Sequence, residues 1–286
     1  MVELGVRDVD YEQYSNRQLA VVPLVVLVVA LFVIGAWWVT TGVPVNRGIE
    51  FTGGTEVQFT ADDSLEEIRA NFDSVEFDSI QPAAGGNTYI LTTQSTDTDS
   101  IEAAANEAGY EVKNLISRNP SFGANSQRQA LAGLGVAFFG MSVLVFVLFR
   151  TFVPSIAVVL SAFSDIMIPV ALMNLLGIQL SLGTVAALLM LVGYSVDSDI
   201  LLNNHILRRR GGFYESTYRA MRTGVTMTLT SLSAMTVMTA VATLFGIPLL
   251  PEVGIVLVFG LVTDLMNTYL MNVSLLRYYK YEGVAT

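Results

Sequence analysis

The stretch LVGYSVDSDILLNN, Leu191 to Asn204, decides how the rest of the sequence is interpreted, because two acids interrupt an otherwise apolar run. The segment before them, Gln179 to Val196, carries no charged residue. A carboxylate at the centre of a membrane-spanning helix costs about 2.5 to 3.5 kcal/mol on insertion scales, so such acids mark functional or helix-pairing sites. Asp197 and Asp199 are therefore the first candidates for a site inside a membrane.

The composition of the whole chain favours a polytopic membrane protein. Of its 286 residues, 52% are hydrophobic and only 14% are charged, which is unlike a soluble globular domain. The chain has no cysteine and one histidine, His205. Disulfides, thiolate metal sites and multi-histidine metal sites are therefore excluded.

Six segments are long and apolar enough to cross a bilayer, which requires about 20 residues in a helix. The first, Leu19 to Val39, is too long for the core of a cleavable signal peptide and is expected to be retained. We expect a six-helix membrane protein divided into an N-terminal segment 1–18, a first span 19–41, an extramembrane domain 42–128, a five-helix bundle 129–276 (spans 129–149, 154–176, 180–203, 223–245 and 252–276) and a C-terminal segment 277–286.

The distribution of basic residues predicts the orientation. One side of the membrane would carry ten Lys and Arg residues, whereas the two short loops on the other side, 177–179 and 246–251, carry none. Because basic residues accumulate on the cytoplasmic side, both termini are expected to be cytoplasmic, as is the cluster Arg208, Arg209 and Arg210. The protein would be a multi-pass component of the cytoplasmic (plasma) membrane, with the domain 42–128 outside.

The predicted outer domain is acidic. Residues 42–129 contain fourteen acids and five basic residues, a large part of the net charge of −10. This balance argues against nucleic acid as a partner. It is also tolerated in high salt, where surface carboxylates are screened, which suggests a halophilic host.

Alternating periodicities predict a small α+β fold for that domain. Strand-like patterns at 55–60, 75–81, 88–93 and 110–117 flank two helical patterns, 64–72 and 98–108. Ser64 and Glu67 have the spacing of a capping box, Gly85–Asn87 has turn chemistry, and Gly109 is expected to stop the second helix. The order β-α-β-β-α-β is that of a ferredoxin-like fold.

Four acids lie inside the predicted spans: Asp165, Asp197, Asp199 and Asp264. Residues two apart on a helix point about 200° from each other, so Asp197 and Asp199 must meet different partners. Asp199 would share a helical stripe with Ser195 and Asn203. Arg222, at the start of the fifth span, is the nearest basic residue able to reach into the bundle or to extend to the lipid head groups.

These acids have two interpretations. They act as a proton or ion relay, or they are hydrogen-bond anchors that hold the bundle together. His205 is expected to be interfacial. The sequence contains no P-loop, no G-x-S-x-G and no metal-ligand cluster. We therefore expect no enzymatic activity, no cofactor and no metal.

Two motifs resemble the SecF family of protein-export membrane subunits. GIEFTGG, which comprises Gly48, Ile49, Glu50, Phe51, Thr52, Gly53 and Gly54, is similar to the signature that follows the first span in that family. GYSVDSD, from Gly193, Tyr194 and Ser195 to Asp199, resembles the fourth-span motif, and Arg222-Thr223 resembles the pair that opens the fifth span. The similarity covers essentially the whole chain.

The resemblance implies an accessory subunit of the Sec pathway that works with SecD beside the Sec translocation channel. It would promote movement of an unfolded, translocating polypeptide. In the bacterial members of the family, this movement is thought to be driven by the proton gradient. Ser198 stands where the bacterial pattern has an acid, Asp197 where it has Asn, and Asp199 where it has Thr. Asp165 and Arg222 match family positions, and Asp264 would be a lineage-specific substitute.

A stand-alone proton-driven exporter of lipid or small molecules on the same fold is the alternative, since a fold does not fix a function. Such exporters usually carry two six-span halves in one chain, whereas this chain has one. A third possibility is a structural clamp without ion coupling.

Overall fold

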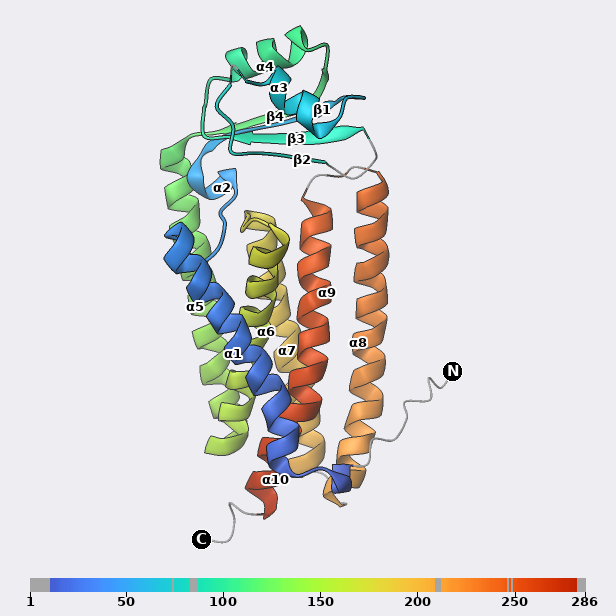
Figure 1. The fold of residues 1–286 in the computed structure, drawn as a ribbon. Coiled ribbons are helices and arrows are strands. Elements are labelled where there is room, and N and C mark those ends of the chain that lie inside the picture. Colours follow the sequence, from blue (N-terminus) through green and yellow to red (C-terminus); the bar gives the residue numbers. More distant parts are fainter. Residues whose placement is uncertain are drawn as a thin grey trace.

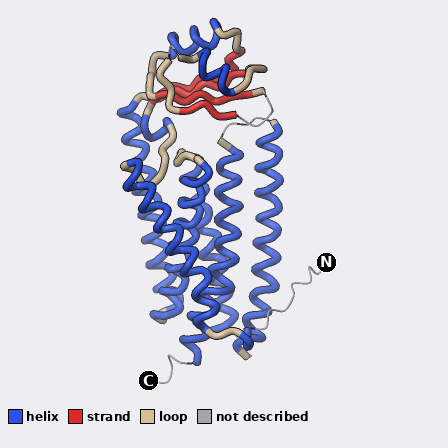
Figure 2. Tube along the Cα trace, viewed as in Figure 1, coloured by secondary structure: helices blue, strands red, loops and turns tan. Residues whose placement is uncertain are grey.

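The computed structural model describes residues 11–73, 75–82, 87–208, 212–245, 247 and 249–281. A bundle of long helices carries a small α+β domain at one end (Figure 1). Figure 2 shows that all of the strands lie in this domain. The prediction of a six-span membrane protein with a ferredoxin-like domain is confirmed. The predicted turn residues Gly85 and Gly86, and Arg209 and Arg210, lie outside the described residues.

Six helical segments in the described part of the chain are long and apolar enough to cross a membrane. They are α1 (Asn16–Thr41), α5 (Pro120–Phe149), α6 (Phe152–Leu176), α7 (Leu182–Arg208), α8 (Phe213–Leu244) and a final segment made of α9 (Leu250–Met266), the π-helix η2 (Asn267–Asn272) and α10 (Val273–Tyr281). Each contains one predicted span apart from terminal residues. Helices α5 and α8 begin nine and ten residues earlier than the spans predicted from hydrophobicity alone.

The outer domain is a four-stranded antiparallel sheet in the order β2-β3-β1-β4. Its elements are β1 (Gly54–Thr60), α3 (Leu65–Asn71), β2 (Ser79–Pro82), β3 (Thr88–Thr93), α4 (Thr98–Glu107) and β4 (Glu111–Arg118). Helices α3 and α4 cover the face of the sheet that points away from the bundle (Figure 1). This is the ferredoxin-like order predicted from the sequence.

Strand β2 is shorter than the predicted 75–81. The alternating apolar residues Val75 and Phe77 pack against the domain core without joining the sheet. The other local signals act as expected: Ser64 and Glu67 form a capping box, and Gly109 has a φ of +78° after α4. The apolar alternation from Val75 therefore reflects contact with the core, whereas strand pairing begins only at Ser79.

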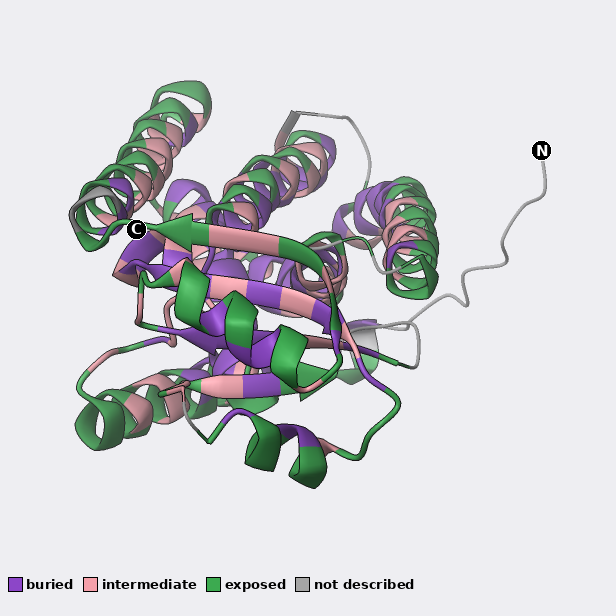
Figure 3. Ribbon diagram, turned by 90° about the horizontal axis from the view of Figure 1, so that it is seen from above, coloured by how far each residue is buried: buried purple, intermediate pink, exposed green. Residues whose placement is uncertain are grey.

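The bundle core lies between α6, α7 and α9, and α5 and α8 flank it (Figure 1). Seen from the side of the outer domain, exposed residues face outward on the peripheral helices (Figure 3). Helices α9 and α7 approach closely because Gly260 lies against Leu191, where an added Cβ would come within 2.2 Å of a Leu191 methyl group. This agrees with the use of small residues at membrane helix contacts.

The start and the end of the described chain meet at the end of the bundle that is opposite the sheet. The Tyr11 hydroxyl donates to the Tyr269 carbonyl at 3.1 Å, and the Arg277 guanidinium donates to the carbonyls of Tyr11 and Tyr14. The segment before α1 and the helix α10 are therefore on the same side of the membrane.

Candidate functional site

Three of the four intramembrane acids converge in the bundle core. Asp165 on α6, Asp199 on α7 and Asp264 on α9 are each at most 1% exposed. The fourth, Asp197, is exposed on the other side of α7, as the 200° separation from Asp199 requires. The candidate site is therefore a cluster of three buried carboxyl groups from three helices.

Asp165 is held by one hydrogen bond to each of its oxygens. Ser195 Oγ donates to Oδ2 and Asn267 Nδ2 donates to Oδ1, both at 2.6 Å. These donors come from α7 and η2, so the carboxyl group joins three helical segments. Ser195, which was predicted as a site residue, thus belongs to the site because it donates a hydrogen bond to Asp165.

Asp199 and Asp264 share the hydroxyl of Thr268. Thr268 Oγ1 lies 2.9 Å from Asp199 Oδ1 and 3.3 Å from Asp264 Oδ1. Asn272 Nδ2 also donates to Asp199 Oδ1, at 2.8 Å. A threonine hydroxyl has one hydrogen, so it cannot donate to both acids at once. A proton on one of the two carboxyl groups would satisfy the second contact.

Ser198 completes the cluster. Its hydroxyl lies 2.8 Å from Asp264 Oδ1 and 2.9 Å from the Ser195 carbonyl. The resemblance predicts that Ser198 occupies an acidic position of the related motif, and in this structure the carboxyl group beside Ser198 comes from α9. The acid next to Ser198 is thus supplied by another helix.

The second oxygens of Asp199 and Asp264 are buried and have no hydrogen-bond partner within the described ranges. Asn203 lies on the same helical stripe as Asp199, and its Oδ1 and Nδ2 are also buried without a hydrogen-bond partner in the described ranges. Buried polar atoms without partners are costly, and a proton or a water molecule relieves that cost. The site thus has unused capacity to bind protons or water.

The other predicted residues lie outside this cluster. Arg222 is on the exposed side of α8. His205 is buried, with Nδ1 2.8 Å from the Leu201 carbonyl. Tyr194 donates to Thr228 Oγ1 at 3.0 Å and so joins α7 to α8. Gly193 is exposed beside Asp197.

Sequence reasoning missed Asn267, Thr268 and Asn272. Thr268 and Asn272 follow Asp264 at intervals of four residues, the spacing of one helix face. Thr268 and Asn272 lie in the π-helix η2, and both donate to Asp199 Oδ1. The available signals were this polar stripe at intervals of four residues and the density of polar residues next to Asp264 in an apolar span.

The GIEFTGG stretch lies at the junction between the outer domain and the bundle. The short helix α2 (Ile49–Thr52) is followed by Gly53 and Gly54, with φ of +79° and +113°. An added Cβ would lie 2.5 Å from Pro120 Cα at Gly53 and 2.2 Å from the Thr93 carbonyl oxygen at Gly54. Glycine is therefore required at both positions by conformation and by space.

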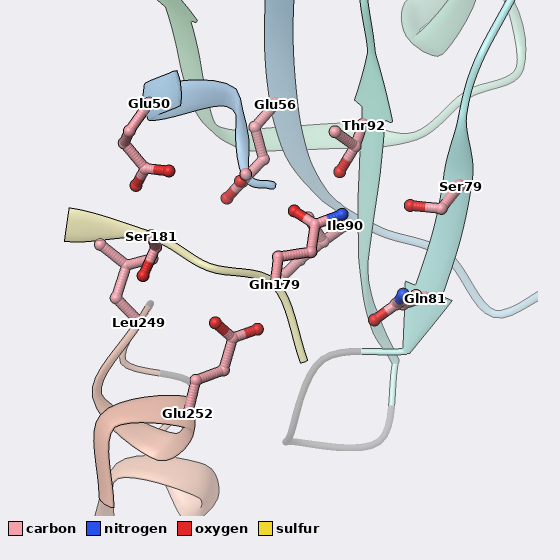
Figure 4. Close-up of a pocket in the computed structure, with 11 residues that line it drawn as sticks. Glu50, Glu56, Ser79, Gln81, Ile90, Thr92, Gln179, Ser181, Leu249 and Glu252 are labelled. Carbon is pink, nitrogen blue, oxygen red and sulfur yellow. The ribbon is translucent and has the colours of Figure 1, made fainter. Parts of the chain in front are cut away.

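Glu50 of the same stretch lines a polar pocket of about 60 Å³ between the sheet and the bundle. Glu56 and Glu252 extend into it from opposite sides, with Gln179 between them (Figure 4). Burial, followed by the Glu50 carboxylate, raises the pKa of Glu56. Within the described ranges, no group of three or more His, Cys, Asp or Glu has the spacing of a metal site.

Comparison with known proteins identifies the family. A family model described as protein export membrane protein SecD/SecF, C-terminal, matches residues 99–282, and a model of the SecD/SecF GG motif matches residues 38–64. The chain belongs to the SecD/SecF family. The GG-motif match contains the Gly53–Gly54 junction, so the family signature coincides with the two glycines that the structure requires.

Several relatives of this chain carry the name protein-export membrane protein SecF. The chain is 65% identical to the protein of Haloferax volcanii over 99% of each chain, and 62% identical to that of Haloquadratum walsbyi over 100% of each. It is 36% identical to the Pyrococcus furiosus protein over 95% of this chain and 94% of the relative. The predicted resemblance to SecF and the expectation of a halophilic host agree with these relatives. They give no support to a stand-alone exporter.

A solved structure has the same fold. The crystal structure of SecDF, a translocon-associated membrane protein from Thermus thermophilus, matches with a TM-score of 0.72 and 22% identity. The match covers 93% of this chain and 38% of that chain. The chain is thus similar to one part of a longer polypeptide.

Proposed function

We propose that this protein is an accessory subunit of Sec protein export that acts with SecD, beside the Sec translocation channel, to promote movement of unfolded polypeptides across the cytoplasmic membrane. The full-length match to relatives named protein-export membrane protein SecF carries this proposal. In this proposed function the subunit catalyses no chemical reaction. Its substrate is the translocating chain.

The orientation belongs to the same proposal. Basic residues at the end of α7, near the start of α8 and in α10 support a cytoplasmic location for these helix ends and for both termini. The α+β domain then faces outward, where a translocating chain emerges. Its sheet edges are β2 and β4, and an extended polypeptide can pair with such an edge.

The cluster of Asp165, Asp199 and Asp264 is the proposed proton-binding site. Its supporting observation is the Thr268 hydroxyl, which offers one hydrogen to two buried carboxyl groups. Binding or release of one proton changes which of the contacts can form. Because the three acids lie on α6, α7 and α9, protonation would change the packing of these helices against one another.

Copurification and export tests address the subunit role. The tagged protein is expressed in a relative of its host that lacks the corresponding gene, and secretion is followed by pulse-chase. We expect restored secretion and recovery of SecD with the tagged chain. A protein that restores no secretion and recovers no SecD would refute the proposal.

A further inference from the structure

The segment before α1 is buried against η2, the π-helix that supplies donors to the carboxyl cluster. Tyr11, in the 3-10 helix η1 (Tyr11–Gln13), is 1% exposed and packs in an apolar cluster with residues of α7, α8, η2 and α10. Its hydroxyl lies 3.1 Å from the Tyr269 carbonyl and 3.4 Å from Met221 Sδ. A thioether sulfur is a weak acceptor, so the Tyr269 carbonyl is the main acceptor of the hydroxyl hydrogen.

The Tyr269 carbonyl lacks the donor that an α-helix would provide. In an α-helix the N–H of Val273 would donate to this carbonyl, four residues earlier. In this structure it donates to the Leu270 carbonyl instead. The Tyr11 hydroxyl supplies a donor from outside the helix at this point. Because a buried carbonyl without a donor is costly, the contact favours the π-helical form of η2.

The form of η2 matters to the cluster because both donors to Asp199 lie in it. Thr268 Oγ1 and Asn272 Nδ2 each donate to Asp199 Oδ1. A return to α-helical hydrogen bonds would rotate Asn272 relative to Asp264 in α9, because a π-helical hydrogen bond closes over five residues instead of four. The placement of these donors therefore depends on the contact that Tyr11 makes.

Helix α10 holds the same segment by its backbone. Arg277 donates from Nη1 to the Tyr11 carbonyl at 3.0 Å and from Nη2 to the Tyr14 carbonyl at 2.8 Å. Its Nε donates to Asn16 Oδ1. The guanidinium presents its donors in a rigid fork, so these contacts fix the chain from Tyr11 to the start of α1. Loss of the Tyr11 hydroxyl alone would therefore leave the segment in place.

We infer that Tyr11 is a positioning residue of the carboxyl cluster: its hydroxyl group holds η2 in the π-helical form and so keeps Thr268 and Asn272 on Asp199. Tyr11 acts through the backbone of η2 and not on an acid directly. The inference rests on the proposed function in that it gives the segment before α1 an effect on the proposed proton-binding site. A ring that only filled the apolar cluster would serve equally well as phenylalanine.

Amide hydrogen exchange of the full-length chain in detergent tests the effect on η2. Tyr11→Phe removes the hydroxyl and keeps the ring. Tyr14→Phe is the matched control, because it makes the same change in the same segment at a side chain that is 47% exposed. We expect the amides of residues 267–274 to exchange roughly three- to tenfold faster in Tyr11→Phe, the change expected from the loss of one hydrogen bond. The control should exchange as the unmodified chain does.

Two outcomes of this measurement would overturn the inference. One is unchanged exchange of residues 267–274 in Tyr11→Phe. The other is an equal increase in all of the helices, which would show a general loss of stability without a particular effect on η2.

The ratio of the secretion rates with and without a proton gradient tests the effect on the cluster. A general loss of folded protein lowers both rates in proportion and leaves this ratio unchanged. We expect Tyr11→Phe to lower the ratio roughly two- to fivefold, the scale of one hydrogen bond. Combined with Thr268→Val it should lower the ratio no further, because both changes act on the same contact to Asp199.

Equal ratios for Tyr11→Phe and Tyr14→Phe would contradict the positioning role. If secretion by the unmodified chain does not depend on the gradient, the proposed proton coupling fails. The exchange of residues 267–274 then still decides whether the Tyr11 hydroxyl holds η2, so the two failures are distinguishable.

Discussion

At Thr268 a single hydroxyl hydrogen faces two buried carboxyl groups, and the identity of this side chain can be tested directly. Thr268→Val removes the hydrogen-bond donor to Asp199, which should destabilise the protein by about 1–3 kcal/mol. Thr268→Ser keeps the hydroxyl and is the matched control. Thermal unfolding in detergent measures both. Equal stability of the two variants would show that the bridge has no energetic role.

Glu56 gives a prediction about pH. Its pKa is raised above the ordinary value of 4.5 by burial and by Glu50, so the folded protein favours the protonated form. The resulting stabilisation is complete below pH 4.5 and is lost as the pH rises through the raised pKa. Glu56→Gln should therefore flatten the fall in stability as the pH rises above 4.5.

The matched control for Glu56 is Glu66→Gln, on the exposed side of α3. Unfolding temperatures of the three proteins at a series of pH values give the comparison. A pH profile for Glu56→Gln that is parallel to that of the unmodified protein would contradict the assignment.

Among the elements, the junction made by α2 and the start of α5 has the strictest requirement. Gly53→Ala places a methyl group against Pro120 at a positive φ, and we expect a loss of at least about 1–3 kcal/mol. Gly133→Ala, in an open part of α5, should be neutral or slightly stabilising. Unfolding in detergent compares them. Similar stability of the two variants would be incompatible with the close approach of Gly53 to Pro120.

The sequence predicted the elements that depend on periodicity or on strong local signals. The six spans and the β-α-β-β-α-β order followed from apolar runs, the Ser64 cap and Gly109. It did not predict the π-helix η2, because no local pattern distinguishes hydrogen bonds five residues apart from those four apart. It also extended β2 to Val75, which is partly buried beside the sheet without pairing.

For the candidate site, the acids were predictable and their grouping was not. Charge in an apolar span identified Asp165, Asp197, Asp199 and Asp264. Helix geometry separated Asp197 from Asp199, but which of the two faces the core depends on the packing of α6 and α9. The contact between Ser198 and Asp264 joins residues 66 apart, and such a pair leaves no pattern in one sequence.

In the molecule as a whole, the two polar regions lie at different depths. The carboxyl cluster is within the bundle, and the pocket lined by Glu50, Glu56 and Glu252 is at the junction with the outer domain. Helix α9 reaches both, since it carries Glu252 in its first turn and Asp264 near its end. A change in the packing of α9 would therefore also move Glu252 in the pocket beside the outer domain.

We propose that the carboxyl cluster of Asp165, Asp199 and Asp264 couples the proton gradient to export. The most direct measurement is the rate of secretion with and without a proton gradient, for Asp165→Asn, Asp199→Asn and Asp264→Asn. Asp99→Asn, at an exposed position of α4, is the control. We predict that the control keeps its dependence on the gradient and that at least one cluster variant exports at the same reduced rate in both conditions. Full gradient dependence in all three cluster variants would contradict the account.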